Sequence, residues 1–330
     1  MSVQITIIGL GQVGTSVGLA LAGQKNIKRV GHDRDYETSR AAQKAGAVDE
    51  VRINLPSSVS EANVVILSLP LSEMRETLGF IARDLQEGAV ILDTAPAKAT
   101  VAAWVKELIP EGRYYIGLSP AAGAEHLHSI ELGVGSARAD LFKNGLFLIN
   151  APSGTPEEAV TLATDLVALL GAQSMFTDPV EADGLLAATH VLPQLAGAAL
   201  LDATVTQPGW VEARKVAARP YATVTAALAY HDEARSLGEA ALANRENSVR
   251  VLDGYILSLQ KLRDQINQGD GPSVVRFLEE AVKARDLWLN ERTRADWHSA
   301  EKSKADSQNF GDKFGQIFLG KLFSRGKKSK

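Results

Sequence analysis

The sequence predicts an α/β domain, built on a doubly wound and mostly parallel sheet, followed by an all-α domain. Two observations predict this fold class. In the first half of the 330 residues, short β-rich runs closed by Gly, Pro or Asp alternate with segments whose apolar residues recur at helical spacing. From about Val180 the strand signals end, and long apolar or amphipathic helical patterns replace them.

The predicted strands of the first half are brief, and each is followed by a helix-like or small-residue segment. In chain order they are residues 4–11, 29–33, 63–70, 89–95, 114–120 and 145–152. Segments between them, such as GTSVGLALAG and SEMRETLGFIARDL, have apolar residues at helical spacing, and a further helix is expected at about 156–170. Strand and helix in alternation imply a parallel sheet that is covered on both faces.

The second half contains three long helical patterns. Residues 181–205 are apolar and alanine-rich, whereas 236–266 and 272–292 are amphipathic. Some of these faces are too apolar for a lone subunit, so we expect a homodimer through this domain. The predicted divisions are 1–178, 179–294 and a polar, flexible tail at 295–330. The basic, partly apolar end of that tail is either a membrane-surface helix or a frayed terminus or small docking helix.

The composition narrows the class of protein. Hydrophobic residues make up 45% and charged residues 22% of the chain, enough for two domains that each bury a core. The formal net charge of −4 gives no indication of a nucleic-acid surface. Cysteine is absent, which excludes disulfides and thiolate metal sites and favours a cytoplasmic protein. The chain enters a strand without a secretory leader, and no apolar run reaches the roughly 18 to 20 residues that a membrane span needs.

The segment IIGLGQVGTSVGLAL places Gly9, Gly11 and Gly14 in the pattern G-x-G-x-x-G, after the first predicted strand and at the start of a helix. In that context the pattern predicts a dinucleotide site of the Rossmann type. The first glycine permits a tight turn, the second lets backbone approach a pyrophosphate, and the third lets the helix pack on its strand. Gln12 and Val13 belong to the same cofactor-binding turn, where helix N–H groups face the anion.

The second predicted strand ends at Asp33, about 20 residues after the last glycine. A carboxylate there suits the ribose hydroxyls of NAD and repels the 2′-phosphate of NADP. The adjacent Arg34 leaves the choice open, because its guanidinium could pair with that phosphate, stack on adenine or face solvent. We expect NAD as the cofactor, with NADP as the alternative.

Several segments together resemble the prephenate/arogenate dehydrogenase family, over nearly the whole chain to about Trp288. The glycine loop resembles the family's N-terminal loop, and VVILSLPL, with Ser68, Leu69 and Pro70, resembles its strand before the nicotinamide site. LSPAAGAEHLHSIELGVGSARADLFKNGLFLINAP is similar to its His-Pro-x-x-Gly-x-Glu loop and the following strand. ATHVLPQLAGAAL resembles its Ser-His-Leu-Pro-His helix, and residues 242–270 resemble its dimerising helix pair.

The resemblance implies an architecture and a chemistry. The architecture is a Rossmann domain and a helical domain in a homodimer, with the active site in a cleft. The chemistry is removal of hydride from a ring carbon that bears a hydroxyl, with loss of CO₂, giving the 4-hydroxyphenyl product of tyrosine biosynthesis. In the family a histidine before the loop proline accepts a hydrogen bond, or the proton, from that hydroxyl.

Three positions depart from the family's pattern. Ser119 replaces the loop histidine, and a serine hydroxyl can hold a substrate oxygen but cannot act as a general base near neutral pH. Pro96, in DTAPAK, replaces a serine, and Gln194 stands at the second histidine of the helix motif. His190 lies in the same segment. The resemblance makes Ser119, His190 and Arg219 the candidate catalytic residues, and it leaves the substrate open.

Substrate binding requires cations, because prephenate and arogenate carry carboxylates. Arg214, Lys215 and Arg219, in EARKVAARPYA, lie where the resemblance places the family's substrate-binding arginines, and Arg219 matches best. Solvated helix charges are the alternative. Lys98, after the fourth strand, is a further candidate for binding a carboxylate.

The loop after Ser119 contains three further polar residues. Glu125 corresponds to the family's acidic residue, and it completes the predicted substrate-binding set with Gln194. His126 and His128 follow Glu125 in the loop. Two interpretations are open: one of these histidines replaces the lost base, or both are exposed loop residues without a catalytic role. Two histidines at this spacing with one glutamate do not make a convincing metal site, so no metal is expected.

Three functions remain in order of preference. The first is an NAD(P)-dependent dehydrogenase of prephenate, arogenate or a close relative, which the intact cofactor loop indicates. The second is a dehydrogenase or reductase of the same fold with another small carboxylated substrate, which the three changed positions indicate. The third is a non-catalytic NAD(H)-binding dimer, which the missing base indicates.

Overall fold

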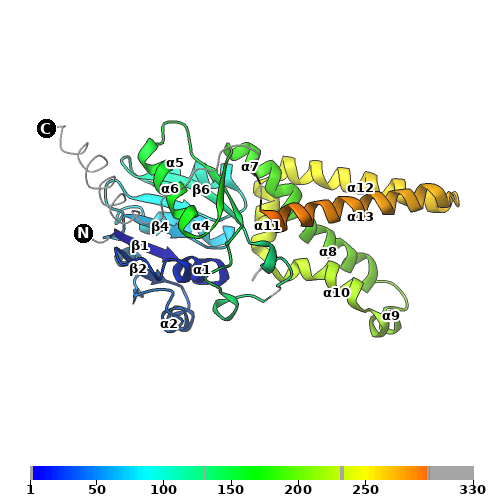
Figure 1. Cartoon of the computed structure of the whole chain (residues 1–330), viewed down its shortest axis with the longest axis horizontal. Coiled ribbons are helices and arrows are strands. Elements are labelled where there is room, and N and C mark those ends of the chain that lie inside the picture. Colours follow the sequence, from blue (N-terminus) through cyan, green and yellow to red (C-terminus); the bar gives the residue numbers. More distant parts are fainter. Residues whose placement is uncertain (1–2, 130, 231–233, 296, 298–330) are drawn as a thin grey trace.

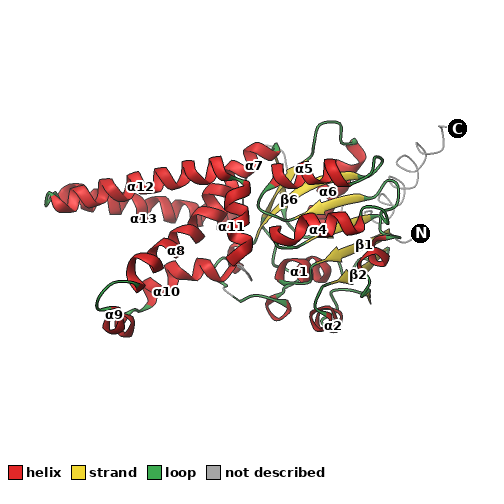
Figure 2. Cartoon of the chain, turned by 180° about the vertical axis from the view of Figure 1, so that it is seen from behind, coloured by secondary structure: helices red, strands yellow, loops and turns green. Residues whose placement is uncertain are grey.

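The computed structural model describes residues 3–129, 131–230, 234–295 and 297. One eight-stranded sheet is flanked by helices, and an elongated helical region extends away from it (Figures 1 and 2). The predicted fold class, a Rossmann-type α/β part followed by a helical part, is confirmed. The predicted flexible tail and its basic helix fall almost wholly outside the described residues.

All six predicted strands are present, and two more complete the sheet. The strands are β1 (Val3–Ile8), β2 (Ile27–His32), β3 (Glu50–Val51), β4 (Val64–Leu67), β5 (Val90–Asp93), β6 (Tyr114–Ala121), β7 (Leu146–Asn150) and β8 (Gln173–Phe176). Their order across the sheet is β3-β2-β1-β4-β5-β6-β7-β8. The strands from β3 to β6 in this order are parallel to one another, whereas β7 is antiparallel to β6 and β8 runs with β7.

The central strands are apolar because both of their faces are covered. Every residue of β1, β4 and β5 is buried, as expected of parallel strands between two helix layers. The sequence patterns did not predict β3, which has two residues, or β8, an edge strand of half-buried and exposed residues. β7 runs antiparallel to β6 across a connection of 24 residues, 122–145, whose described residues contain only the short turns η1 (Ala124–His126) and η2 (Val134–Ser136) and no crossover α-helix.

Six helices cover the sheet. They are α1 (Gln12–Ala20), α2 (Tyr36–Lys44), α3 (Leu55–Val59), α4 (Leu71–Ile81), α5 (Lys98–Leu108) and α6 (Glu157–Leu169). Buried residues of α1, α2 and α6 join one apolar cluster with one face of the sheet. Those of α3, α4 and α5 join a second cluster with the other face. The sheet is therefore doubly wound, as predicted.

The helical region begins at Pro179. It contains α7 (Pro179–Leu186), the π-helical turn η3 (Ala187–Val191), α8 (Leu192–Val205), α9 (Trp210–Val216), α10 (Arg219–Thr225), η4 (Ala226–Tyr230), α11 (Ala234–Ala243), α12 (Arg245–Asn267) and α13 (Gly271–Arg294). The long helices α12 and α13 run side by side and project away from the sheet (Figure 1).

Two predicted helices are each divided in the structure. The 236–266 pattern breaks at Asn244, whose φ of −112° and ψ of 44° are not helical. The 181–205 pattern contains the π-helical turn, which directly precedes the turn with Pro193. Proline has no N–H and its ring crowds the carbonyl four residues earlier, so a wider turn relieves the helix at this point.

The helical run Pro179–Val205 is long and apolar enough to cross a membrane by length and composition. This corrects the expectation that no apolar run reaches that length. Its helices pack against α5, α10 and α12, and core helices of proteins outside membranes meet the same criteria. Length and composition alone are therefore weak evidence for a membrane span.

Candidate functional site

The loop between β1 and α1 packs tightly at two of its three glycines. Gly9 has a φ of +89°, and a Cβ there would lie 2.2 Å from the carbonyl oxygen of Ser68. A Cβ on Gly14 would lie 2.0 Å from the carbonyl oxygen of Gly9. A Cβ on Gly11 would meet no atom of the described residues within 4 Å. The protein's own packing requires Gly9 and Gly14, whereas the space beside Gly11 is open to a ligand.

The first turn of α1 is suited to an anion. Gly11 is its N-cap without a side-chain hydrogen bond, and neither Gln12 nor any other residue of that turn is acidic. The first N–H groups of a helix have no acceptor within the helix, and the helix dipole places partial positive charge there. A phosphate beside Gly11 would therefore be stabilised by backbone groups alone.

Asp33 follows β2, the strand next to β1, and the order of the strands reverses on the other side of β1, between β1 and β4. Its Oδ2 accepts a hydrogen bond from the Leu10 N–H at 2.8 Å, and its Oδ1 accepts one from the Asp35 N–H at 3.0 Å. On the opposite side, the Ser68 N–H donates to the carbonyl of Ile8 at 2.8 Å. The carboxylate is therefore held against the glycine loop, at the end of β2, as the sequence predicted.

Arg34 forms an ion pair with Glu73, in the first turn of α4, at 2.5 Å. The Arg34 side chain is 68% exposed, so solvent screens this pair and its energy is small. The pair still bears on cofactor choice, because the Arg34 guanidinium that would have to attract a 2′-phosphate is already bound to a carboxylate.

Ser119 lies near the carboxyl end of β6 and is 6% exposed. Its hydroxyl has no hydrogen-bond partner among the described residues. The loop that follows is held by backbone contacts: the Gly123 N–H donates to the Leu141 carbonyl at 2.8 Å, and a Cβ on Gly123 would lie 2.3 Å from the Lys143 carbonyl oxygen. A buried hydroxyl without a partner is costly unless a ligand or water bonds to it. The Ser119 hydroxyl therefore requires a partner that the described residues do not supply.

Lys98 does not lie free to bind a substrate carboxylate. Its side chain is fully buried, and the ammonium donates to Asp93 Oδ1 at 2.9 Å, to the Asp93 carbonyl at 3.0 Å and to the Leu118 carbonyl at 2.7 Å. These three acceptors use its three N–H donors. Desolvation by burial lowers the pKa of Lys98, against the opposing effect of Asp93. Lys98 thus connects β5 to β6, and its contact on β6 is the residue just before Ser119.

Two further members of this buried cluster were not predicted from the sequence. The Tyr115 hydroxyl donates to Asp93 Oδ2 at 2.6 Å, and burial raises the pKa of Tyr115 well above its ordinary value. A Cβ on Gly117 would lie 2.9 Å from the Lys98 side chain and 3.1 Å from the Tyr115 hydroxyl. The absence of a side chain at Gly117 therefore leaves room for Lys98 and Tyr115 to pack, two residues before Ser119 in the same strand.

Asp183 connects the helical region to the sheet, and it was also missed. Its carboxylate accepts the N–H groups of Lys98 at 2.6 Å and Ala99 at 3.1 Å, so it caps α5, whose own N-cap residue has no capping side chain. Its carbonyl accepts the Asn244 amide at 2.6 Å. The signal in the sequence was a carboxylate between an alanine and a glycine, near the start of an apolar helical pattern.

His190 and Gln194 lie together at the π-helical turn. The Gln194 amide nitrogen donates to the His190 carbonyl at 2.7 Å. Gln194 is 2% exposed, and its amide oxygen has no partner among the described residues, whereas His190 is half-buried. The bond fixes the amide so that a single acceptor oxygen remains for another group.

The expected substrate-binding cations are not near Ser119 within one chain. Arg214 and Lys215 lie in the last turn of α9, and Arg219 begins α10; all three are exposed. Both views place α9 at the end of the helical region that is distant from the sheet (Figures 1 and 2).

The loop after Ser119 brings one unpredicted carboxylate beside two predicted residues. His126 Nε2 lies 3.5 Å from Asp140 Oδ1, and ligand atoms of Glu125, His126 and Asp140 lie within 4.8 Å of one another. A metal ion could bridge them, although exposed acidic groups often lie together without one. His128 is exposed.

With this geometry in place, comparisons with known proteins identify relatives. Residues 17–176 match the family model described as the prephenate dehydrogenase, nucleotide-binding domain. The chain is 25% identical over 285 residues to a prephenate dehydrogenase of Bacillus subtilis, covering 86% of this chain and 75% of that protein. It is also 25% identical over 289 residues to a cyclohexadienyl dehydrogenase of Zymomonas mobilis, covering 85% and 94%.

Two solved structures have the same fold over most of their length. Prephenate dehydrogenase from Aquifex aeolicus, in complex with hydroxyphenyl propionate and NAD⁺, has a TM-score of 0.76 and 20% identity, covering 88% of this chain and 99% of that one. Synechocystis arogenate dehydrogenase has a TM-score of 0.67 and 22% identity, covering 86% and 99%.

The buried Asp183 carboxyl predicts a pH-dependent contribution to stability. Burial raises its pKa from the ordinary value of 3.8, so the folded state holds this proton more tightly than the unfolded chain. Its contribution to the free energy of unfolding is therefore fully present below pH 3.8 and is lost as pH rises through the folded-state pKa. Asp183→Asn removes this titration, so the stability of the wild type relative to Asp183→Asn should decrease as pH rises from about 3.5 to 6.

Urea-denaturation midpoints across this pH range measure the difference. Asp178→Asn, at the N-terminus of the same helix, shows the effect of an equivalent substitution that does not join α7 to α5. A difference that stays constant or grows with pH would contradict the assignment.

Proposed function

Because the chain belongs to the prephenate dehydrogenase family and is an NAD(P)-dependent dehydrogenase, we propose that it oxidises prephenate, arogenate or a close carboxylated relative with loss of CO₂. One observation carries the proposal. The open space beside Gly11, the fixed carboxylate of Asp33 and the unpaired hydroxyl of Ser119 all lie at the carboxyl edge of one parallel sheet. Ligands of open α/β sheets bind at that edge.

The glycine loop fits a dinucleotide, since only Gly11 faces open space and the helix behind it begins without an acidic residue. Gly11 and the first turn of α1 would hold the pyrophosphate, and Asp33 would hold the adjoining ribose. Ser68, Leu69 and Pro70, after β4, would lie on the nicotinamide side. When bound, NAD⁺ supplies the hydride acceptor.

The charges around the ribose position support NAD over NADP. Asp33 would repel a 2′-phosphate, and Glu73 neutralises Arg34, the cation that could attract one. NADP remains the alternative, because a phosphate could displace Glu73 from a guanidinium at an exposed site.

In this proposal Ser119 orients the substrate hydroxyl. Its buried Oγ has both a donor and an acceptor to offer and no protein partner. The Lys98 ammonium, bonded to the carbonyl just before Ser119, fixes the peptide from which the hydroxyl projects. Ser119 cannot remove the proton itself, and the absence of a positioned base is expected to lower the rate by about 10²- to 10⁴-fold.

A second candidate is a dehydrogenase or reductase of the same fold that acts on a different small carboxylated substrate. The changed positions Ser119, Pro96 and Gln194 favour it, because they alter polar contacts while the glycine loop is intact. The distance of α9 from the sheet within one chain also favours it (Figure 2). A panel of hydroxy acids, keto acids and imines with NADH or NADPH would distinguish the two.

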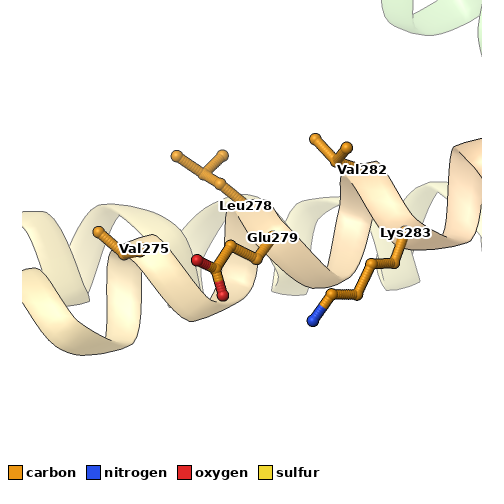
Figure 3. A pocket seen from close by; sticks show the side chains of 5 residues that line it. All are labelled: Val275, Leu278, Glu279, Val282 and Lys283. Carbon is orange, nitrogen blue, oxygen red and sulfur yellow. The ribbon is translucent and has the colours of Figure 1, made fainter.

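We further propose that the active form is a homodimer through α12 and α13. These helices expose many large apolar side chains, which are Val249, Tyr255, Ile256, Leu257, Leu259, Ile266, Val275, Leu278, Val282, Leu287 and Trp288. On α13 the apolar side chains Val275, Leu278 and Val282 project to one side (Figure 3). Surfaces of this kind are typical of protein interfaces.

The proposed reaction is tested by mixing the purified protein with NAD⁺ and either prephenate or arogenate, and following NADH absorbance. We expect slow turnover for the wild type and a rise of about 10²-fold or more for Ser119→His, because the imidazole supplies the base. Ser119→Ala is the control and should lower turnover. No rate above the blank with either substrate at any pH would exclude this reaction.

Substitutions at two glycines test the cofactor site. Gly11→Ala should fold normally, since its Cβ meets no described atom, yet abolish NAD⁺ binding, because the methyl group fills the proposed pyrophosphate position. Gly14→Ala should lower the melting temperature as well, because its Cβ would overlap the Gly9 carbonyl. Calorimetric titration with NAD⁺ and thermal melting separate the two effects. Unchanged affinity in Gly11→Ala would contradict the placement.

A matched pair of valines tests the dimer. Val282→Asp places a charge on the apolar surface of α13 and should convert the dimer into monomers. Val216→Asp makes the same change at an exposed valine of α9 and should leave the molar mass unchanged. Light scattering coupled to size exclusion measures both. A wild type that is monomeric at micromolar concentration would contradict the proposal.

A further inference from the structure

Arg292, in the last turn of α13, is a buried cation with an unusual partner. It is 7% exposed, and its guanidinium donates to the carbonyl of Ala122, with the Trp297 ring over it at 5.3 Å from the centroid. Among the described residues no carboxylate lies within ion-pair distance of it, and burial lowers its pKa. Buried arginines normally pair with carboxylates, so this contact needs an explanation other than charge pairing.

Ala122 is the first residue after β6 leaves the sheet. The pairing of β6 with β7 ends at Ala121, and Ser119 lies three residues before Ala122. The carbonyl that Arg292 binds therefore belongs to the first residue of the loop that follows the strand end of Ser119.

The same loop is held from its other side. The Gly123 N–H donates to the Leu141 carbonyl, and a Cβ on Gly145 would lie 2.4 Å from the Ala121 carbonyl oxygen. The segment between Ser119 and Gly123 is thus packed between residues 141–145 and the end of α13. Arg292 supplies the contact from the helical region, and α13 packs on η1 just beyond.

We propose that Arg292 is a positioning residue, which holds the Ala122 carbonyl and thereby fixes the start of the loop that follows the strand end of Ser119. The guanidinium contributes a charge-assisted hydrogen bond, which a neutral donor would not match in strength. Trp297 covers the cation and excludes water from the bond. The catalytic consequence rests on the proposed dehydrogenase function, whereas the loop geometry does not.

The chain offers a matched control at the same helix end. Gln173, in β8, donates its amide to the Ala295 carbonyl at 2.7 Å, and so it anchors the end of α13 without contacting the loop. Gln173→Ala weakens the helix end, whereas Arg292→Met removes the loop contact and keeps an apolar side chain of similar length. Arg292→Lys retains the positive charge and an N–H donor but not the planar guanidinium. It is the variant to test if Arg292→Met does not fold.

Hydrogen exchange of backbone amides in the full-length protein is the first measurement. In Arg292→Met the amides of residues 121–124 should exchange about tenfold faster or more, matching the loss of a hydrogen bond from a charged donor. Arg292→Lys should lie between this variant and the wild type, and Gln173→Ala should match the wild type. Unchanged exchange in Arg292→Met, or an equal increase in Gln173→Ala, would overturn the proposal.

The second measurement is activity. With prephenate or arogenate, Arg292→Met should lower kcat about tenfold or more, and Arg292→Lys should recover part of the loss. Calorimetric affinity for NAD⁺ should be unchanged, because the guanidinium bonds to the Ala122 carbonyl and not to the glycine loop. Equal losses in Arg292→Met and Gln173→Ala would indicate a structural role only. If the wild type does not turn over either substrate while the exchange result holds, the proposed reaction fails and the positioning role stands.

Discussion

The buried ion pair between Lys98 and Asp93 is the constraint on which the site depends. A fully buried ammonium is tolerated only when its charge is compensated and its N–H groups are bonded, and here the acceptors belong to two neighbouring strands. Lys98 therefore holds the carboxyl end of β5 to the neighbouring part of β6. Because Asp183 caps the helix that begins at Lys98, the same few atoms also orient the helical region. The strand end that carries Ser119 and the helical region therefore share one anchor.

The central part of the fold could be predicted because its cause is local. Parallel strands between two helix layers must be apolar throughout, and glycines at fixed spacing must follow the first of them. The edge strands β3 and β8 could not be predicted in this way, since a two-residue strand and a half-exposed one have no distinctive pattern. Nor could the direction of β7, because neither the residues within the strand nor a 24-residue connection to β6 determines which way the strand runs.

The site divides along the same line. Asp33 was predictable because one βαβ unit contains both the glycine loop and the carboxylate that contacts it. Lys98 was assigned to the substrate because a sequence does not distinguish a solvated lysine from a buried one. Asp183 and Arg292 act on residues more than eighty and more than one hundred positions away along the chain, and only the folded structure brings them to the strand ends. A carboxylate within an apolar helical pattern was a signal for Asp183, whereas Arg292 is one of many charged residues in an amphipathic helix and had no distinguishing signal.

The π-helical turn at Ala187–Val191 has a consequence for comparing this helix with its relatives. The motif Ser-His-Leu-Pro-His has one residue between its first histidine and the proline, whereas this chain has two, Val191 and Leu192, between His190 and Pro193. In a regular α-helix one additional residue turns everything beyond it by about 100°. A single widened turn can absorb that insertion locally. The imidazole and the proline then keep their relative orientation on the helix, although one more residue separates them in the sequence. A sequence alignment without a gap, counted from the proline, would then match His190 to the wrong position of the family's motif. A superposition of the two backbones would match it to the motif's first histidine.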